Sequence, residues 1–211
     1  MTNPLLHGIS HLNHAAVKIC TAQKTIYVDP YHLPDPEHNA DLIFITHHHH
    51  DHLSPEDISA IIKADTIVVV PASIADSVNN LGAAQVIKVE PEREYVVEDI
   101  PFETISAYNI NKRFHPKEQA WVGYNITANG VRYYIAGDTD AIPEMNRIQT
   151  DVAFLPVGGT YTMDAKEAAE AASVIKPKIA VPIHYGEVVG SLEDARNFVN
   201  WLQPGIQGII I

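Results

Sequence analysis

The segment Asp41–Asp57 reads DLIFITHHHHDHLSPED, and its three parts decide the fold class. Its first six residues form a continuous apolar run, which is typical of a strand covered on both faces. Its last four, Ser54–Asp57, offer an N-cap, a proline at the first helical position and acids in the first turn, so we expect a helix to about Lys63. The histidines between them therefore lie at the carboxyl end of a buried strand.

Similar short apolar runs, separated by Pro, Gly, Asn and Asp, predict many strands and few helices. The strands expected at 15–20 and 25–28 form a hairpin, and further strands are expected at the ranges 66–70, 85–89, 94–97, 102–108, 122–128, 131–136, 151–155, 179–183 and 208–211. A capping box of Asp164 and Glu167 opens one later helix, Ser191 and Asp194 open the last, and Ser73 opens another that reaches about Leu81. We expect an α/β fold with two packed sheets and helices outside, a four-layer αββα sandwich, with residues 1–211 as a single domain.

Composition excludes several classes of protein. The formal net charge of −12 disfavours nucleic acid and anionic membrane surfaces as partners. No apolar run approaches the roughly 20 residues that cross a bilayer, and the N-terminus does not resemble a signal peptide. The single cysteine, Cys20, excludes an internal disulfide framework. These features favour a cytoplasmic protein, with its oligomeric state open and a homo-oligomer allowed.

Five of the twelve histidines fall between His47 and His52, which is the main anomaly of the composition. Because side chains alternate along an extended chain, His47 and His49 point to one side, and a turn at Asp51-His52 brings those two side chains back toward the same point. Imidazole and carboxylate suit zinc, manganese and iron. A structural zinc site would be closed and often rich in cysteine, so we expect a catalytic site with one or two divalent metal ions, zinc foremost.

The pattern His47-x-His49-x-Asp51-His52 matches the H-x-H-x-D-H signature of the metallo-β-lactamase superfamily. The resemblance covers nearly the whole chain, because three further segments resemble the early Asp-Pro strand end, the G-D-T segment and the late strand-end histidine of that family: Ile26–Pro30, Gly137–Thr139 and Ile183–Gly186. Leu155–Gly159 with Tyr161–Met163 resembles most the small bacterial branch of metal-dependent hydrolases, which is similar to L-ascorbate-6-phosphate lactonase. The family fold is the αββα sandwich.

The resemblance implies a role for each matching residue. His47 and His49 would hold a first metal, while three others, Asp51, His52 and His184, would hold a second. Asp138 would bridge the two ions, and Asp51 and Asp138 would be the catalytic carboxylates.

One position departs from the family pattern. The family places a further histidine after a middle strand, but the matching stretch of this chain ends in Asn109. The next histidine is His115, a few residues along the loop. We expect His115 to turn back and complete the first metal site, with Asn109 as the alternative, either as a weak ligand or through a water.

Three groups of side chains flank the expected site. Asp29 is expected to orient a ligand histidine or to fix a loop. His14 resembles a histidine near the active site of related hydrolases, and a surface position at the start of a strand explains it equally well. Tyr161, Tyr185 and Lys117 could position an anionic substrate.

A bound metal lowers the pKa of its water to about 7. The expected activity is therefore hydrolysis of a small-molecule ester, lactone or phosphoester by metal-bound hydroxide, with Asp51 as a proton acceptor. Two alternatives stay open: a phosphodiesterase or nuclease of the same superfamily, and a non-catalytic metal-binding sensor. β-Lactam hydrolysis is disfavoured because no export signal is seen.

Overall fold

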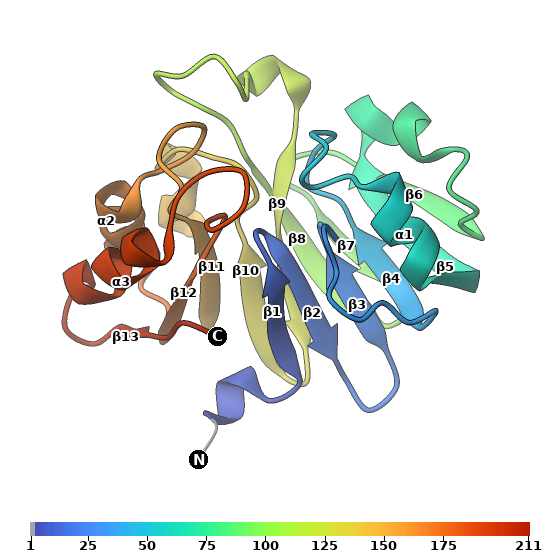
Figure 1. The fold of residues 1–211 in the computed structure, drawn as a ribbon, viewed down its shortest axis with the longest axis horizontal. Coiled ribbons are helices and arrows are strands. Elements are labelled where there is room, and N and C mark those ends of the chain that lie inside the picture. The colour runs from blue at the N-terminus through green and yellow to red at the C-terminus, as the bar shows by residue number, and fades with distance from the viewer. Residues whose placement is uncertain (1–2) are drawn as a thin grey trace. The chain divides into compact units, whose positions relative to one another are not determined.

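The computed structural model describes residues 3–211, which form two compact units. The first unit ends at Glu90, and the second runs from Pro91 to Ile211. Each unit has one sheet of its own, drawn in blue to cyan for the first unit and in green to red for the second (Figure 1). In the described residues no helix has the length and apolar character that a bilayer crossing needs.

The sheet of the first unit is mixed, and its strands follow one another in chain order. An antiparallel ladder joins the first three strands, and a parallel ladder joins the third to the sixth. The strands are β1 (Ile9–Asn13), β2 (Ala16–Cys20), β3 (Thr25–Val28), β4 (Ala40–Phe44), β5 (Ile62–Pro71) and β6 (Gln85–Val89). The parallel strands β4 and β5 are buried along most of their length, as continuous apolar runs predict.

Helix α1 (Pro55–Ile61) follows β4 and begins as the sequence predicts. Ser54 is its N-cap, and the Ser54 hydroxyl accepts a hydrogen bond from the backbone N–H of Asp57. The helix buries Ile58 and Ile61 and then ends, because the chain turns directly into β5 at Ile62. Short 3-10 helices, η1 (Pro4–Leu6) and η2 (Ala72–Val78), complete the unit.

The sheet of the second unit has seven strands in the order β13-β12-β11-β10-β9-β8-β7. Strands β7 to β10 form antiparallel ladders, and β10 to β13 form parallel ones. Their bounds are β7 (Glu94–Val97), β8 (Ile100–Ser106), β9 (Val122–Ala128), β10 (Val131–Ile135), β11 (Val152–Pro156), β12 (Ile179–Ile183) and β13 (Gln207–Gly208). Asn129-Gly130, both with positive φ, form the turn between β9 and β10 that the sequence predicts.

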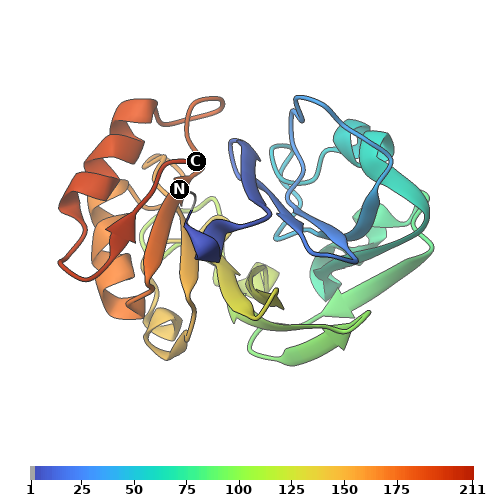
Figure 2. The same ribbon diagram turned by 90° about the horizontal axis from the view of Figure 1, so that it is seen from below.

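Helices α2 (Ala165–Ile175) and α3 (Leu192–Trp201) lie side by side along the β11–β12 side of this sheet (Figure 2). The predicted capping box between Asp164 and Glu167 is present, and Ser191 and Asp194, which were predicted to open the last helix, form a second one. The α2 face that packs inward is mostly alanine, so the helix approaches the sheet closely and joins the core of this unit. Two more 3-10 helices, η3 (Lys117–Gln119) and η4 (Pro143–Arg147), lie in the loops.

Strand direction places the important loops of each unit at one edge of its sheet. In the second unit β8, β10, β11 and β12 run the same way, so the loops after Ser106, Ile135, Pro156 and Ile183 share an edge. In the first unit the loops after Val28 and Phe44 and the β1–β2 turn likewise share one edge. Ligands of α/β sheets bind at such carboxyl ends.

Several element predictions need correction. The helix expected from Ser73 to Leu81 is the 3-10 helix η2, in a segment where the short polar side chains of Ser and Asp compete with the backbone for hydrogen bonds. The terminal strand expected over 208–211 is only Gln207–Gly208, because its ladder with β12 stops at Ala180. Strand β1 was not predicted. It is short and polar in part, and it forms through a non-local pairing with β2.

Candidate metal centre

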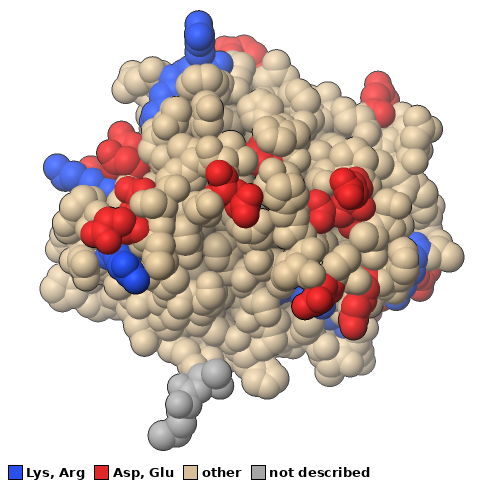
Figure 3. Space-filling view, in the orientation of Figure 1, with Lys and Arg blue, Asp and Glu red and all other residues tan. Residues whose placement is uncertain are grey.

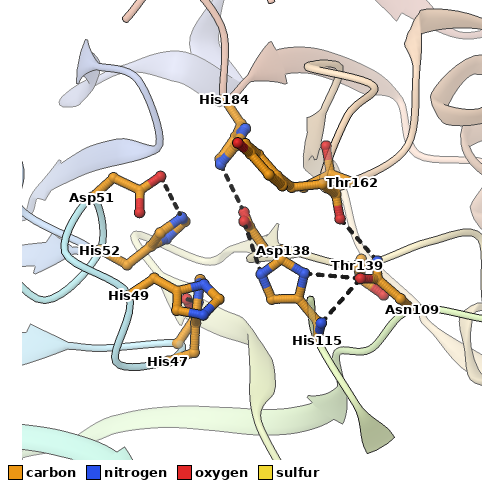
Figure 4. Close-up of polar contacts among 12 residues, drawn as sticks. His47, His49, Asp51, His52, Asn109, His115, Asp138, Thr139, Thr162 and His184 are labelled. Carbon is orange, nitrogen blue, oxygen red and sulfur yellow. Dashed lines mark hydrogen bonds and ion pairs between the residues drawn. The ribbon is translucent and has the colours of Figure 1, made fainter. Parts of the chain in front are cut away.

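The chain from His47 to His52 leaves β4 and turns as predicted. The backbone carbonyl of His49 accepts hydrogen bonds from the N–H groups of His52 and Leu53, which closes the turn ahead of α1. His47 and His52 are buried, His49 is half-buried, and His48 and His50 are exposed. The Nε2 of His47 lies 3.1 Å from the Nδ1 of His49. The two imidazoles predicted to share a side are therefore close together, as Figure 4 shows.

Asp29, which is fully buried, organises this cluster from behind. Its carboxylate accepts hydrogen bonds from the Thr46 N–H (2.8 Å), the Thr46 hydroxyl (2.6 Å) and the His52 Nδ1 (2.7 Å). The Thr46 hydroxyl in turn lies 3.0 Å from the His47 Nδ1, from which it can accept. Both imidazoles thus direct Nδ1 toward this network and leave Nε2 as the nitrogen that a metal would take. The predicted contact between Asp29 and a histidine is confirmed.

Asp51 and His14 form a second buried pair in this unit. The His14 Nε2 lies 3.2 Å from an oxygen of Asp51, and the same oxygen is 3.8 Å from the His52 Nε2. His14 has a φ of 45° and lies in the turn between β1 and β2, where the residue is 1% exposed. His14 is therefore not a surface residue, and its contact places it behind a predicted metal ligand.

The second unit carries the other candidate residues on three loops of one sheet edge. Asp138 follows β10, and its two carboxylate oxygens face different imidazoles (Figure 4). One oxygen lies 3.2 Å from the His115 Nε2, and the other lies 3.1 Å from the His184 Nε2. All three side chains are buried. The structure thus brings together the carboxylate and the two histidines that the sequence placed far apart in the chain.

Asn109 holds His115 in place. The Asn109 Oδ1 accepts from the His115 N–H at 3.0 Å and lies 3.1 Å from its Nδ1. The Asn109 Nδ2 donates to the Tyr161 carbonyl and to Asp140. The amide is therefore engaged on both sides and supports the histidine, whose Nε2 faces Asp138. This arrangement favours His115 over Asn109 as the ligand.

Comparison with known proteins places the chain in a family. The model of the β-lactamase superfamily domain matches residues 8–184. A UPF0173 metal-dependent hydrolase of Lysinibacillus sphaericus is 31% identical over 92% of both chains. The chain belongs to the metal-dependent hydrolases of the β-lactamase superfamily.

Solved structures agree with this membership. A candidate metal-dependent hydrolase from Parabacteroides distasonis is 34% identical and superimposes with a TM-score of 0.83 over 96% of this chain and 91% of its own. A metallo hydrolase from the archaeon Ignicoccus hospitalis is 22% identical, with a TM-score of 0.79 over 96% of this chain and 94% of its own. At this identity the comparison supports a shared fold and no shared function. The predicted fold class, the αββα fold of the metallo-β-lactamases, is confirmed.

In this superfamily member the buried imidazoles and carboxylates of each unit, called here its donor set, fit a divalent cation. Each unit offers buried imidazole nitrogens and carboxylate oxygens, the ligands that zinc, manganese and iron accept in proteins. Buried carboxylates such as Asp51 and Asp138 are costly without a compensating positive charge. Imidazoles held with Nε2 toward these oxygens, by Asp29 in the first unit and by Asn109 in the second, are in the form that binds a metal.

Sequence reasoning missed Gly158, a residue of this superfamily member that supports a candidate ligand. Gly158 is required because a Cβ there would lie 2.7 Å from the His184 carbonyl oxygen and 3.0 Å from its Nδ1. His184 itself has a φ of 59°, and Asp29 has a φ of 48°, conformations that cost energy for residues other than glycine and that concentrate at functional sites. A glycine pair after a buried strand, Gly158-Gly159, was the one signal that could have pointed to this close approach.

Proposed function

We propose that this protein hydrolyses a small-molecule ester, lactone or phosphoester at a two-metal centre built from both donor sets. The first ion would be held by His47, His49 and His115. The second would be held by Asp51, His52 and His184, and Asp138 would contact both. The observation that carries the proposal is the Asp138 carboxylate, whose oxygens each face a different imidazole at 3.1–3.2 Å, as a bridging ligand would require.

A divalent metal in this centre would supply a nucleophilic water of lowered pKa and would polarise the carbonyl or phosphoryl oxygen under attack. The residues of the chain orient the donors. Asp29 fixes the His52 ring directly and the His47 ring through the Thr46 hydroxyl. Asn109 does the same for His115.

Proton transfer is assigned to the buried pair in the first unit. One Asp51 oxygen lies 3.2 Å from the His14 Nε2, so a proton taken up by this carboxylate can be shared with the imidazole. His14 is buried, and its backbone carbonyl accepts from the His11 ring at 2.7 Å, which keeps the turn in place. His14 thus acts through Asp51, as a positioning residue.

Charge supports a small substrate over nucleic acid. The chain carries 26 acidic and 14 basic side chains, a formal net charge of −12. The face in Figure 3 shows scattered acidic patches, and its basic side chains form no continuous stripe. A protein that binds nucleic acid through its phosphates needs such a stripe.

A reconstitution assay tests the proposal. The protein is stripped with a chelator, reloaded with zinc, manganese or iron, and assayed on aryl esters, lactones, a chromogenic phosphomonoester and a chromogenic phosphodiester, with His49→Ala as the inactive control. We expect metal-dependent turnover of an ester, lactone or phosphomonoester. Turnover of the phosphodiester alone would instead assign the phosphodiesterase function, and stoichiometric metal with no turnover on any substrate would identify a sensor.

A further inference from the structure

The loop after β8 is anchored at its start by a single buried carboxylate. Asp140 accepts hydrogen bonds from the backbone N–H of Ile110 (2.8 Å), the ammonium of Lys112 (2.6 Å) and the side-chain amide of Asn109 (3.1 Å). The backbone of this part of the loop is therefore fixed. The positive charge of Lys112 is neutralised by the Asp140 carboxylate, because the two groups form a charge-assisted hydrogen bond.

The far end of the loop is anchored in the same way. The Lys117 ammonium donates to Glu144 at 2.9 Å and to the Tyr108 hydroxyl at 3.3 Å, and it lies 4.4 Å from the centre of the Tyr108 ring. These hydrogen bonds to Glu144 and Tyr108 raise the pKa of Lys117. Lys117, which the sequence suggested as an anion-binding residue, is therefore already used to tie η3 to η4.

Arg113 lies between the two anchors and differs from both lysines. It is exposed, and within residues 3–211 no carboxylate pairs with it. Figure 3 shows basic side chains over this loop, the yellow-green segment at the top of Figure 1. The chain has a net charge of −12, so acidic partners for a cation are plentiful. The positive charge of Arg113, which lies on a fixed loop, is nevertheless not used in an ion pair within residues 3–211.

The residue after Arg113 in the chain, Phe114, belongs to an aromatic pair. Phe114 packs edge-to-face on Tyr161, with ring centres 4.7 Å apart and planes at 88°. Phe114 is still 38% exposed, and Ile110 on the same loop is 54% exposed. The Tyr161 backbone is held by the Asn109 amide at 2.9 Å, so the pair is as fixed as the loop. Such a pair offers an apolar wall to a bound molecule.

This loop leaves the same sheet edge of the second unit as the loops that carry Asp138 and His184, and Arg113 comes two residues before His115. We propose that Arg113 is a substrate-positioning residue that binds a carboxylate or phosphate group remote from the hydrolysed bond, while the Phe114–Tyr161 pair packs against the body of the substrate. This inference rests on the proposed function and narrows it to anionic substrates. The planar guanidinium suits either anion, because both accept paired hydrogen bonds.

Matched substrates that differ only in a remote charge test this assignment. One pair is the p-nitrophenyl monoester of adipic acid and its neutral methyl diester, and the other is a lactone with and without a phosphate on a distant hydroxyl. Each is assayed with the metal-loaded wild type, Arg113→Gln and Arg113→Lys. The control is Arg196→Gln, which changes another exposed arginine on α3 of the same unit.

We expect Arg113→Gln to raise KM about 10-fold for the anionic member of the preferred pair, as loss of one charge-assisted contact would. Its kcat and its kinetics on the neutral member should stay within about twofold, Arg113→Lys should recover part of the loss, and Arg196→Gln should match the wild type. The pair that shows the effect identifies the anion as carboxylate or phosphate.

Equal effects of Arg113→Gln on the charged and neutral members, or no effect on either, would overturn the assignment. Metal-dependent turnover of neutral esters with no preference for anions would refute the role of Arg113 and leave the proposed function standing. Calorimetric titration gives a readout that needs no turnover. Its ligands are non-hydrolysable amide analogues of both members of the adipate pair, and the phosphorylated and unphosphorylated lactams that correspond to the two lactones. Equal affinity of the wild type for charged and neutral analogues in both pairs would also refute the role.

Discussion

Asp29→Asn separates the folding role of the buried network from its role in metal binding. Asparagine has nearly the same shape but keeps only one acceptor oxygen. With that oxygen toward the Thr46 N–H, the new NH₂ group faces the Thr46 hydroxyl and the His52 Nδ1. The hydroxyl can rotate and accept, whereas His52 can do so only by moving its proton to Nε2, the nitrogen proposed to bind the metal.

The magnitude follows from these contacts. Hydrogen bonds to a charged group contribute roughly 1.5–3 kcal/mol, and the variant loses one such bond outright at His52 while the other two can be remade in neutral form. We therefore expect a free energy of unfolding lowered by about 1–3 kcal/mol in the metal-free protein. We also expect metal affinity lowered about 10- to 100-fold, the usual effect of removing a carboxylate behind a ligand histidine.

Metal titration followed by calorimetry, together with urea unfolding of the metal-free protein, measures the two effects separately. Asp41→Asn is the matched control, since Asp41 also accepts from a backbone N–H (Thr25, 2.7 Å) and a side chain (Lys63, 2.7 Å) but, among residues 3–211, has no hydrogen bond with a histidine. It should lose stability and keep its metal affinity. A metal affinity of Asp29→Asn equal to that of the wild type would show that Asp29 does not orient a metal ligand through His52.

Four further substitutions test single features. His115→Ala should remove about one metal equivalent, while Asn109→Ala should weaken that site only about 10-fold; metal counts by elemental analysis decide, and the reverse order would make Asn109 the ligand. Gly158→Ala should displace His184 and lower metal affinity at least 10-fold, with unchanged affinity contradicting this. Asp151, whose pKa is lowered by the Lys178 hydrogen bond, contributes stability above its ordinary pKa of 3.8 that is lost as pH falls through its lower folded value. Asp151→Asn should therefore lower the free energy of unfolding by roughly 0.5 kcal/mol at pH 7 and leave it unchanged in acid. Urea midpoints that differ from those of the wild type by the same amount at both pH values would contradict this.

Local signals carried most of the fold prediction. The caps at Ser54, Asp164 and Ser191 predicted where three helices begin, because a capping side chain and its partner lie within three residues. The continuous apolar runs predicted the buried parallel strands, because this signal too lies within a few consecutive residues. Elements that depend on distant partners were harder, and β1 (Ile9–Asn13) was missed because its polar residues are stabilised by pairing with β2.

The candidate site likewise has features that local sequence predicts and features that depend on distant partners. The motif residues His47 to His52 could be predicted from spacing, and Asp29 from its place at a strand end. The support given by Asn109 to His115 could not be predicted, because it depends on a loop that folds back so that one amide oxygen meets both the N–H and the ring of the histidine. Nor could the left-handed backbone of His14 and His184, which tertiary contacts impose on residues that do not favour it.

Anomalous diffraction from crystals of the metal-loaded protein is the sharpest test of the proposed two-metal centre. We expect two anomalous peaks about 3.5–4 Å apart, with imidazole nitrogens at about 2.0–2.1 Å. Each ion should take ligands from both donor sets, with Asp138 between the ions. A single peak bound by residues of one unit alone, or no peak at stoichiometric metal, would contradict it.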